Sequence, residues 1–196
     1  MITIENLDFA YGKQKVFENI NLSFKEGCIY GLLGENGVGK TTLLKIITGL
    51  QNPNSGVCIV DDKKAFDRNP EFLQDIFFLP EGVIAQTYTT PIKYADNLGK
   101  FYPNYDRNFF ISLMKEMEVD GTKKFEQLSY GQQKKAMFCF AVALKTRYLL
   151  LDEPTNGLDI PSKSDFRRIL SHACTDHTTV IISTHQVKDV ENLIDP

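Results

Sequence analysis

The segment at residues 34–41, which reads GENGVGKT, has the residue types needed to bind a polyphosphate. Glycines let the backbone curl so that its N–H groups point at one ligand, and a helical pattern follows, so the ligand would lie at a helix N-terminus. Lys40 would place its ammonium between the β- and γ-phosphates, and Thr41 would offer its hydroxyl to Mg²⁺. The alternative is a chance glycine-rich turn, which the preceding apolar stretch and the following helix disfavour. The loop residues expected to contact a nucleotide are Gly34, Asn36, Gly37, Gly39, Lys40, Thr41 and Thr42.

Two adjacent carboxylates, Asp152 and Glu153, end an apolar stretch at residues 148–151. In open α/β sheets, ligands bind at the C-terminal ends of the strands. A solvated strand-to-turn junction is the alternative, but the phosphate loop in the same chain favours a catalytic pair. We therefore expect Asp152 to hold Mg²⁺ through water and Glu153 to orient or deprotonate the attacking water.

The elements that must position these residues have the pattern of an α/β protein. Continuous apolar stretches, typical of strands buried on both faces of a parallel sheet, lie at residues 28–33, 148–151 and 179–183. Helical patterns lie between or after them at residues 40–48, 131–145, 162–174 and 186–194. Together they predict an α/β core with a mostly parallel sheet.

Two regions differ from this core. Alternating apolar residues at positions 2–9 and 20–24 predict an N-terminal antiparallel β subdomain. The middle of the chain is helical around residues 92–101 and 107–117 and has no buried-strand pattern, which predicts an inserted α-helical subdomain whose core is aromatic. We expect a single domain over residues 1–196, with the catalytic core at 1–82 and 129–196 and the helical subdomain at 83–128.

Composition excludes several classes of protein. The net charge of −3 argues against a nucleic-acid partner, because phosphate binding requires a basic face, and the Lys134-Lys135 pair is expected to be solvated. No apolar run approaches the ~20 residues of a membrane-spanning helix, and the N-terminus lacks a signal-peptide pattern. The 4 cysteines lie far apart and are expected to be buried free thiols. These features predict a cytoplasmic protein.

The segment LSYGQ at residues 128–132 begins a predicted helix, and taken alone Ser129 with Gln132 is a capping box. Between a phosphate loop and an Asp-Glu strand end, however, it resembles the signature segment of the ATP-binding cassette family, usually Leu-Ser-Gly-Gly-Gln. Here Tyr130 stands in the third place. The resemblance covers essentially the whole chain and implies a P-loop NTPase core. It also implies that Ser129, Gly131 and Gln132 contact the ATP held by an opposite subunit.

The resemblance extends to other positions. Tyr11 lies where the family stacks an aromatic ring on adenine, although alone it would be a turn aromatic. Asp159 matches the loop that crosses the dimer interface, and alone it would be a helix cap. His185 matches the switch histidine that senses the γ-phosphate, although a histidine at a strand end is often structural. Glu81 stands where most members have glutamine, and we expect it to reach the metal or the water.

The family resemblance implies an ATPase subunit of an ABC transporter. It would bind ATP and Mg²⁺ at the interface of a head-to-tail homodimer or heterodimer and drive a separate integral membrane permease, with a lean toward export. Its location would be cytoplasmic, on the cytoplasmic face of the cell membrane. The expected catalytic residues are Glu153, His185 and Lys40, and the expected metal-binding residues are Thr41, Asp152 and Glu81.

Three alternatives remain open at this point. A soluble family member acting on ribosomes or DNA usually carries paired cassettes or coiled-coil inserts. A regulatory module would switch by nucleotide occupancy, against which Glu153 and His185 argue. An unrelated GTPase is disfavoured because the chain has no Asn-Lys-x-Asp motif. Family members usually continue past the helix after His185, whereas this sequence ends at Pro196, so we expect a truncated or minimal member.

Overall fold

The computed structural model describes residues 1–83, 85, 87–191 and 193, and its N-terminal part forms an antiparallel sheet. This sheet has the strand order β2-β1-β4-β5. Its strands are β1 (Ile2–Tyr11), β2 (Gln14–Phe24), β4 (Ser55–Val60) and β5 (Lys63–Lys64). The alternation at residues 2–9 and 20–24 therefore predicted the first pair of strands, whereas β4 and β5 were not predicted.

The second sheet is parallel and has the order β3-β8-β7-β6. Its strands are β3 (Ile29–Leu33), β6 (Ile76–Leu79), β7 (Tyr148–Asp152) and β8 (Thr179–Thr184). The apolar stretches predicted β3, β7 and β8. The short edge strand β6 was missed, because a run of only four apolar residues has no periodicity that separates a strand from a helix.

Six α-helices surround the sheets in the described part of the chain. They are α1 (Lys40–Ile47), α2 (Pro70–Asp75), α3 (Pro91–Leu98), α4 (Arg107–Glu116), α5 (Tyr130–Ala143) and α6 (Ile160–Ala173). None of these helices is long and apolar enough to cross a bilayer.

The predicted helix at residues 186–194 is wrong. The structure has a single 3₁₀ turn, η4 (Val187–Asp189), and residues 192 and 194–196 lie outside the described part. So short a helix is marginal unless a packed face stabilises it, and β-branched Val187 and Val190 do not favour it.

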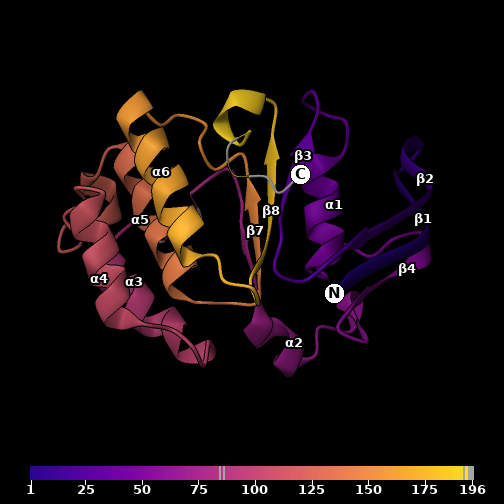
Figure 1. The fold of residues 1–196 in the computed structure, drawn as a ribbon, viewed down its shortest axis with the longest axis horizontal. Helices are drawn as coiled ribbons and strands as arrows, with labels where there is room; N and C mark the ends of the chain where they lie inside the picture. The colour runs from indigo at the N-terminus through magenta and orange to yellow at the C-terminus, as the bar shows by residue number, and fades with distance from the viewer. Residues whose placement is uncertain (84, 86, 192, 194–196) are drawn as a thin grey trace.

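The parallel sheet separates two hydrophobic cores, because successive strand residues point to opposite faces. Leu149 and Leu151 pack with α3 to α6, whereas Tyr148 and Leu150 pack with α1 and the antiparallel sheet. Figure 1 shows this layering, with α1 between the two sheets and the other long helices beyond β7 and β8. Both faces of β7 are covered, so its polar residue, Asp152, can reach the surface only at the carboxyl end.

Two expectations about side chains need correction. Cys58 and Cys139 are buried as expected, but Cys28 and Cys174 are half-buried. In the aromatic group of the helical region, Phe110 is buried, whereas Phe101 in the 3₁₀ turn η2 (Gly99–Phe101) is 68% exposed. Phe101 lies at the end of that turn and lines the apolar groove described below.

Candidate active site

The phosphate loop connects β3 to α1 and curls as its glycines allow. Gly37 has φ 86° and Gly39 has φ 106°, both in the left-handed region. A Cβ on Gly39 would come 2.7 Å from Val16 and 2.9 Å from Phe17, so β2 packs tightly beneath the loop. Glycine is therefore required at position 39 for both conformation and space.

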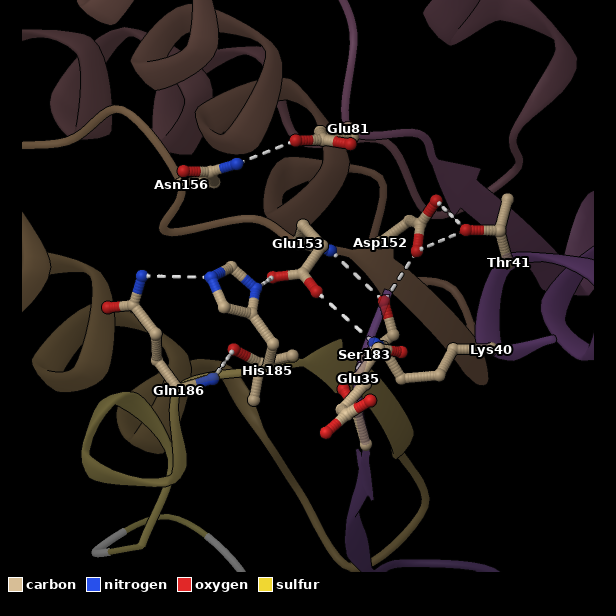
Figure 2. A network of polar contacts seen from close by, with 12 residues as sticks. Glu35, Lys40, Thr41, Glu81, Asp152, Glu153, Asn156, Ser183, His185 and Gln186 are labelled. Atoms are coloured by element: carbon tan, nitrogen blue, oxygen red, sulfur yellow. Dashed lines mark hydrogen bonds and ion pairs between the residues drawn. The ribbon is translucent and has the colours of Figure 1, made fainter. Parts of the chain in front are cut away.

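Lys40, the first residue of α1, points back over this loop. Its Nζ donates hydrogen bonds to the carbonyl oxygens of Gly34, at 2.6 Å, and Glu35, at 2.9 Å. The same ammonium lies 3.6 Å from Oε1 of Glu153, and both side chains are largely buried. The positive charge is thus held between the loop and the carboxylate at the end of β7 (Figure 2).

Asp152 joins the ends of three elements. Thr41 Oγ1 on α1 donates to both of its carboxylate oxygens, at 2.8 and 3.0 Å, and Ser183 Oγ on β8 donates to Oδ1. A hydroxyl beside a carboxylate is a set of hard oxygen donors that fits Mg²⁺, which usually takes one or two protein carboxylates together with waters and phosphates. Among the described residues, no group of three or more His, Cys, Asp or Glu side chains is arranged to hold a metal ion by itself.

Glu153 follows with φ 44°, a conformation that non-glycine residues rarely adopt. Its N–H donates to the carbonyl oxygen of Ser183 at 3.0 Å, and its Oε2 lies 3.0 Å from Nδ1 of His185. Its Oε1 is buried and has no hydrogen-bond partner among the described residues, only the longer ion pair with Lys40. A buried acceptor left without a donor costs stability, and such groups are often functional.

The position of the proton on His185 follows from its neighbours. Lys163 Nζ donates to Oε1 of Gln186 at 3.0 Å, which turns the amide nitrogen of Gln186 toward Nε2 of His185, 3.3 Å away. Since the amide nitrogen is a donor, Nε2 must accept and Nδ1 must carry the proton. His185 therefore donates from Nδ1 to Glu153 and holds that carboxylate in place.

A groove of about 320 Å³ connects the loop to these acids. Tyr11 lies at its rim, 49% exposed, with its hydroxyl 3.2 Å from Oγ1 of Thr42. The exposed ring leaves a face for a planar ligand to stack on. The groove is lined by Tyr11, Gln14, Val16, Asn36, Gly37, Gly39, Lys40, Thr41, Thr42, Glu81 and Glu153.

Glu81, just after β6, lines the same groove but bonds away from Asp152. Its Oε1 accepts a hydrogen bond from Nδ2 of Asn156 at 2.6 Å, as Figure 2 shows. The carboxylate therefore links the segment after β6 to the segment after β7. No hydrogen bond between Glu81 and Thr41 or Asp152 is present in the described structure.

Ser129, Gly131 and Gln132 are not among the described residues that line the groove. Ser129 caps α5 as the sequence suggested, since the N–H of Gln132 donates to its Oγ at 3.3 Å and its own N–H donates to Oε1 of Gln132 at 3.0 Å. Asp159 caps α6 as an acceptor, since the N–H of Ser162 donates to its Oδ1 at 2.9 Å, and hydrogen bonds from Ser162 hold the pKa of this carboxyl below its usual range. Ser129 and Tyr130 are exposed, and Gly131 and Gln132 are half-buried.

Sequence reasoning missed several residues that hold this arrangement. Ser183 and Gln186 lie beside predicted residues and gave no separate signal, and Asn156 was one polar residue in a turn. Lys134 was expected to be solvated, which is wrong: it is only 7% exposed. The sequence carried no signal that separates it from Lys135, which has the same spacing to buried Phe138 and Cys139 on α5 and is only half-buried.

Comparisons with known proteins show which family and which solved structures this chain is similar to. A family model described as ABC transporter matches residues 17–156. The ABC transporter ATP-binding protein YtrB of Bacillus subtilis is 30% identical, over 98% of this chain and 66% of its own length. The lantibiotic transport ATP-binding protein SrtF of Streptococcus pyogenes is 29% identical, over 100% and 84%. The dimeric post-hydrolysis structure of the ATP-binding cassette MJ0796, bound to ADP and Pi, superimposes with a TM-score of 0.85 at 26% identity, over 96% of this chain and 90% of that one.

Proposed function

The chain belongs to the ABC transporter family as one of its ATP-binding, ATP-hydrolysing domains, and from that premise we propose that it powers transport through a separate membrane permease. The observation that carries the proposal is the buried Glu153 carboxylate, with one oxygen held by His185 and the other without a hydrogen-bond partner among the described residues. This oxygen faces the phosphate loop, where an attacking water would need a base.

The hydrolysis step uses groups already in place. Glu153 accepts a proton from water as the water oxygen bonds to the γ-phosphorus, and the bond from that phosphorus to the β–γ bridging oxygen breaks, giving ADP and phosphate. Lys40 and the N–H groups of the loop at residues 34–41 hold the phosphates. His185 keeps the Glu153 carboxylate oriented through its Nδ1–H.

Magnesium is part of the proposal because Thr41 and Asp152 offer the oxygen donors that it prefers. When bound, it would neutralise charge on the phosphates. Thr41 and Asp152 would hold it, and Ser183 keeps the Asp152 carboxylate facing Thr41. In our proposal Glu81 lies close to this position without being a direct ligand, because Asn156 takes one of its oxygens.

We propose a head-to-tail dimer in which Ser129, Gly131 and Gln132 of one subunit complete the groove of the other. The support is that these residues do not line the nucleotide groove of their own chain, and that apolar side chains in the phosphate loop and next to Asp159 are exposed. Val38 in the loop is 52% exposed, and Ile160, directly after Asp159, is 82% exposed. Burial of such residues would stabilise a dimer that closes on ATP.

The permease would dock in an apolar groove of about 640 Å³ between the core and the helical subdomain that we place at residues 83–128. Its apolar lining comes from Leu73, Phe77, Phe78, Leu98, Phe101 and Tyr102. The groove also includes Pro80, which directly precedes Glu81, so a segment docked there would lie next to the nucleotide groove. Through this contact the protein would sit on the cytoplasmic face of the membrane, where we propose that it drives export.

The decisive experiment compares ATP hydrolysis by the wild-type chain and Glu153→Gln. The variant should lose at least about 100-fold in turnover, because amide nitrogen and oxygen cannot take the proton, yet bind ATP normally. Blocked hydrolysis should also trap an ATP-dependent dimer, visible by size-exclusion chromatography with light scattering. Wild-type turnover in the variant would reject Glu153 as the base. Absence of hydrolysis by the wild type would favour a module that responds to occupancy alone.

The docking surface is tested with Phe101→Asp, which should leave basal ATP hydrolysis unchanged. With the permease present in lipid vesicles, the same variant should lose the permease-dependent change in ATPase rate. Equal permease-dependent rates for Phe101→Asp and wild type would place the docking site elsewhere.

A further inference from the structure

Lys134 is a buried cation that the hydrolysis step does not use. It lies on the inner face of α5, and its Nζ donates to the backbone carbonyl oxygens of Glu153, at 3.1 Å, and Asn156, at 2.7 Å. A lysine is rarely buried unless its donors are satisfied, and here they bridge both ends of the turn after β7. The N–H of Asn156 donates to the same Glu153 carbonyl oxygen at 3.2 Å, so Lys134 reinforces the closure of that turn.

The turn needs such support because Glu153 has a positive φ. A non-glycine residue in this region is strained and persists only where its surroundings hold it. Ser183 fixes the N–H of Glu153, and Lys134 fixes its carbonyl oxygen. The peptide groups on either side of the Glu153 side chain are therefore tied to β8 and to α5.

The charges around Lys134 fit the same role. Burial lowers the pKa of its ammonium, while Glu81, Glu153 and Asp152 act in the opposite direction. Glu81 and Glu153 line the nucleotide groove, and Asp152 precedes Glu153 at the end of β7. A cation among them reduces their mutual repulsion without blocking the groove, because its donors are directed to backbone oxygens.

We propose that Lys134 is a positioning residue that holds Glu153 in the conformation needed for hydrolysis, and that it ties this conformation to α5. Ser129 and Gly131 lie at the start of the same helix, two turns or less from Lys134. A shift of α5 caused by a ligand at its N-terminus would therefore act directly on the Glu153 backbone. The inference rests on the proposed function, in which Glu153 activates water and a second subunit's ATP meets Ser129.

The test compares Lys134→Met with Lys135→Met in the full chain. Lys135 is the matched control, because its Nζ also donates to a backbone carbonyl oxygen, that of Met117 at 3.3 Å, but away from the groove. Lys134→Met should lower kcat at least about tenfold with KM for ATP unchanged, since it loses charge-assisted hydrogen bonds to the base's own backbone. Lys135→Met should change neither constant.

A second readout needs no ATP. Amide hydrogen exchange in residues 153–158 should be faster in Lys134→Met than in wild type, and unchanged in Lys135→Met. If Lys134→Met fails to fold, Lys134→Gln replaces it, since its shorter amide cannot reach both carbonyls, and the same loss in kcat is expected. Unchanged kcat and exchange in the folded variant, or a rise in KM as large as the fall in kcat, would overturn the proposal. A wild-type chain without ATPase activity would instead overturn the proposed function, and the exchange result would still decide whether Lys134 holds this turn.

Discussion

The carboxyl and amino ends of β7 both carry networks of charged groups, but the two networks are completed differently. At the amino end, Asp61 accepts hydrogen bonds from the Met1 amine and the Tyr148 hydroxyl, each at 2.6 Å, and pairs with Arg147 at 2.7 Å. Arg147 also pairs with Glu26 at 2.9 Å. At the carboxyl end, Glu153 has one buried oxygen without a hydrogen-bond partner among the described residues. Lys40 donates its hydrogen bonds to carbonyl oxygens of the phosphate loop.

The contrast separates a stabilising network from a reactive one. Each charged group at the amino end meets an opposite charge within hydrogen-bond distance, so the network favours the folded chain. The carboxyl end holds a cation and an acid 3.6 Å apart, with room beside them for a ligand. Functional sites often retain polar groups with unsatisfied hydrogen bonds, such as Oε1 of Glu153, at a cost in stability. Substitutions at the carboxyl end should therefore mainly weaken ATP binding, and substitutions at the amino end should mainly lower the free energy of unfolding.

The largest effect is expected from Lys40→Ala at the carboxyl end. Loss of charge-assisted hydrogen bonds to two phosphates should weaken ATP binding by at least ~100-fold. Titration with a fluorescent ATP analogue at fixed Mg²⁺ measures the affinity. Lys145→Ala removes the same charge from an exposed pair with Asp106 and should bind ATP normally. Equal affinities of all three proteins would mean that the loop is not the site.

The reciprocal change is Asp61→Asn at the amino end. It should lower the free energy of unfolding by about 1–3 kcal/mol and leave ATP affinity unchanged, because it weakens hydrogen bonds to a charged acceptor far from the groove. Urea denaturation measures the first quantity and the same titration the second. A variant as stable as wild type but impaired in ATP binding would break the contrast between the two ends.

The difference in free energy of unfolding between wild type and Asp61→Asn should depend on pH. Burial alone would raise the pKa of Asp61, but hydrogen bonds from the Met1 amine and Tyr148, with the charge of Arg147, outweigh it and lower the pKa. The contribution of Asp61 to stability is then fully present above its unfolded pKa of about 3.9 and is lost as the pH falls through the folded value. The stability gap between wild type and Asp61→Asn should therefore narrow below about pH 4. A gap that widens in acid would show the opposite sign.

A smaller effect is expected at the rim of the groove. Tyr11→Ala should weaken ATP binding roughly tenfold, and Tyr11→Phe should not, because stacking on a base is worth about 1–3 kcal/mol and needs only the ring. The fluorescent titration measures both. If Phe loses as much affinity as Ala, the hydroxyl contact with Thr42 is the important one.

The smallest effect is expected for Glu81→Gln, which tests whether Glu81 takes part in hydrolysis. Glutamine keeps an oxygen that can accept from Asn156, so ATP affinity should stay within about twofold and turnover should change by no more than about fivefold. Steady-state ATPase measurements give both constants. A loss as large as that of Glu153→Gln would make Glu81 part of the hydrolytic machinery rather than a link to Asn156.

The sequence predicted the parts of this molecule that depend on local pattern. The loop at 34–41 is determined by its glycines, and α1 begins at Lys40 as expected, although half of its residues are β-branched. Strand β6 could not be found, since its four residues carry too little periodicity. The roles of Lys134 and Gln186 depend on contacts between elements distant in the chain, and nothing in their neighbouring residues shows where those contacts fall.

Strand β7 has a consequence for how this chain can change over evolutionary time. Its five residues are all buried, with alternate side chains in opposite cores, the Asp61 network at its first residue and the phosphate site at its last. A single inserted or deleted residue would exchange the contents of both cores and misplace one of the two networks. Insertions and deletions should therefore be absent from this strand in related sequences and occur in the connecting loops instead. The number of residues in β7 should then stay constant across the lineage.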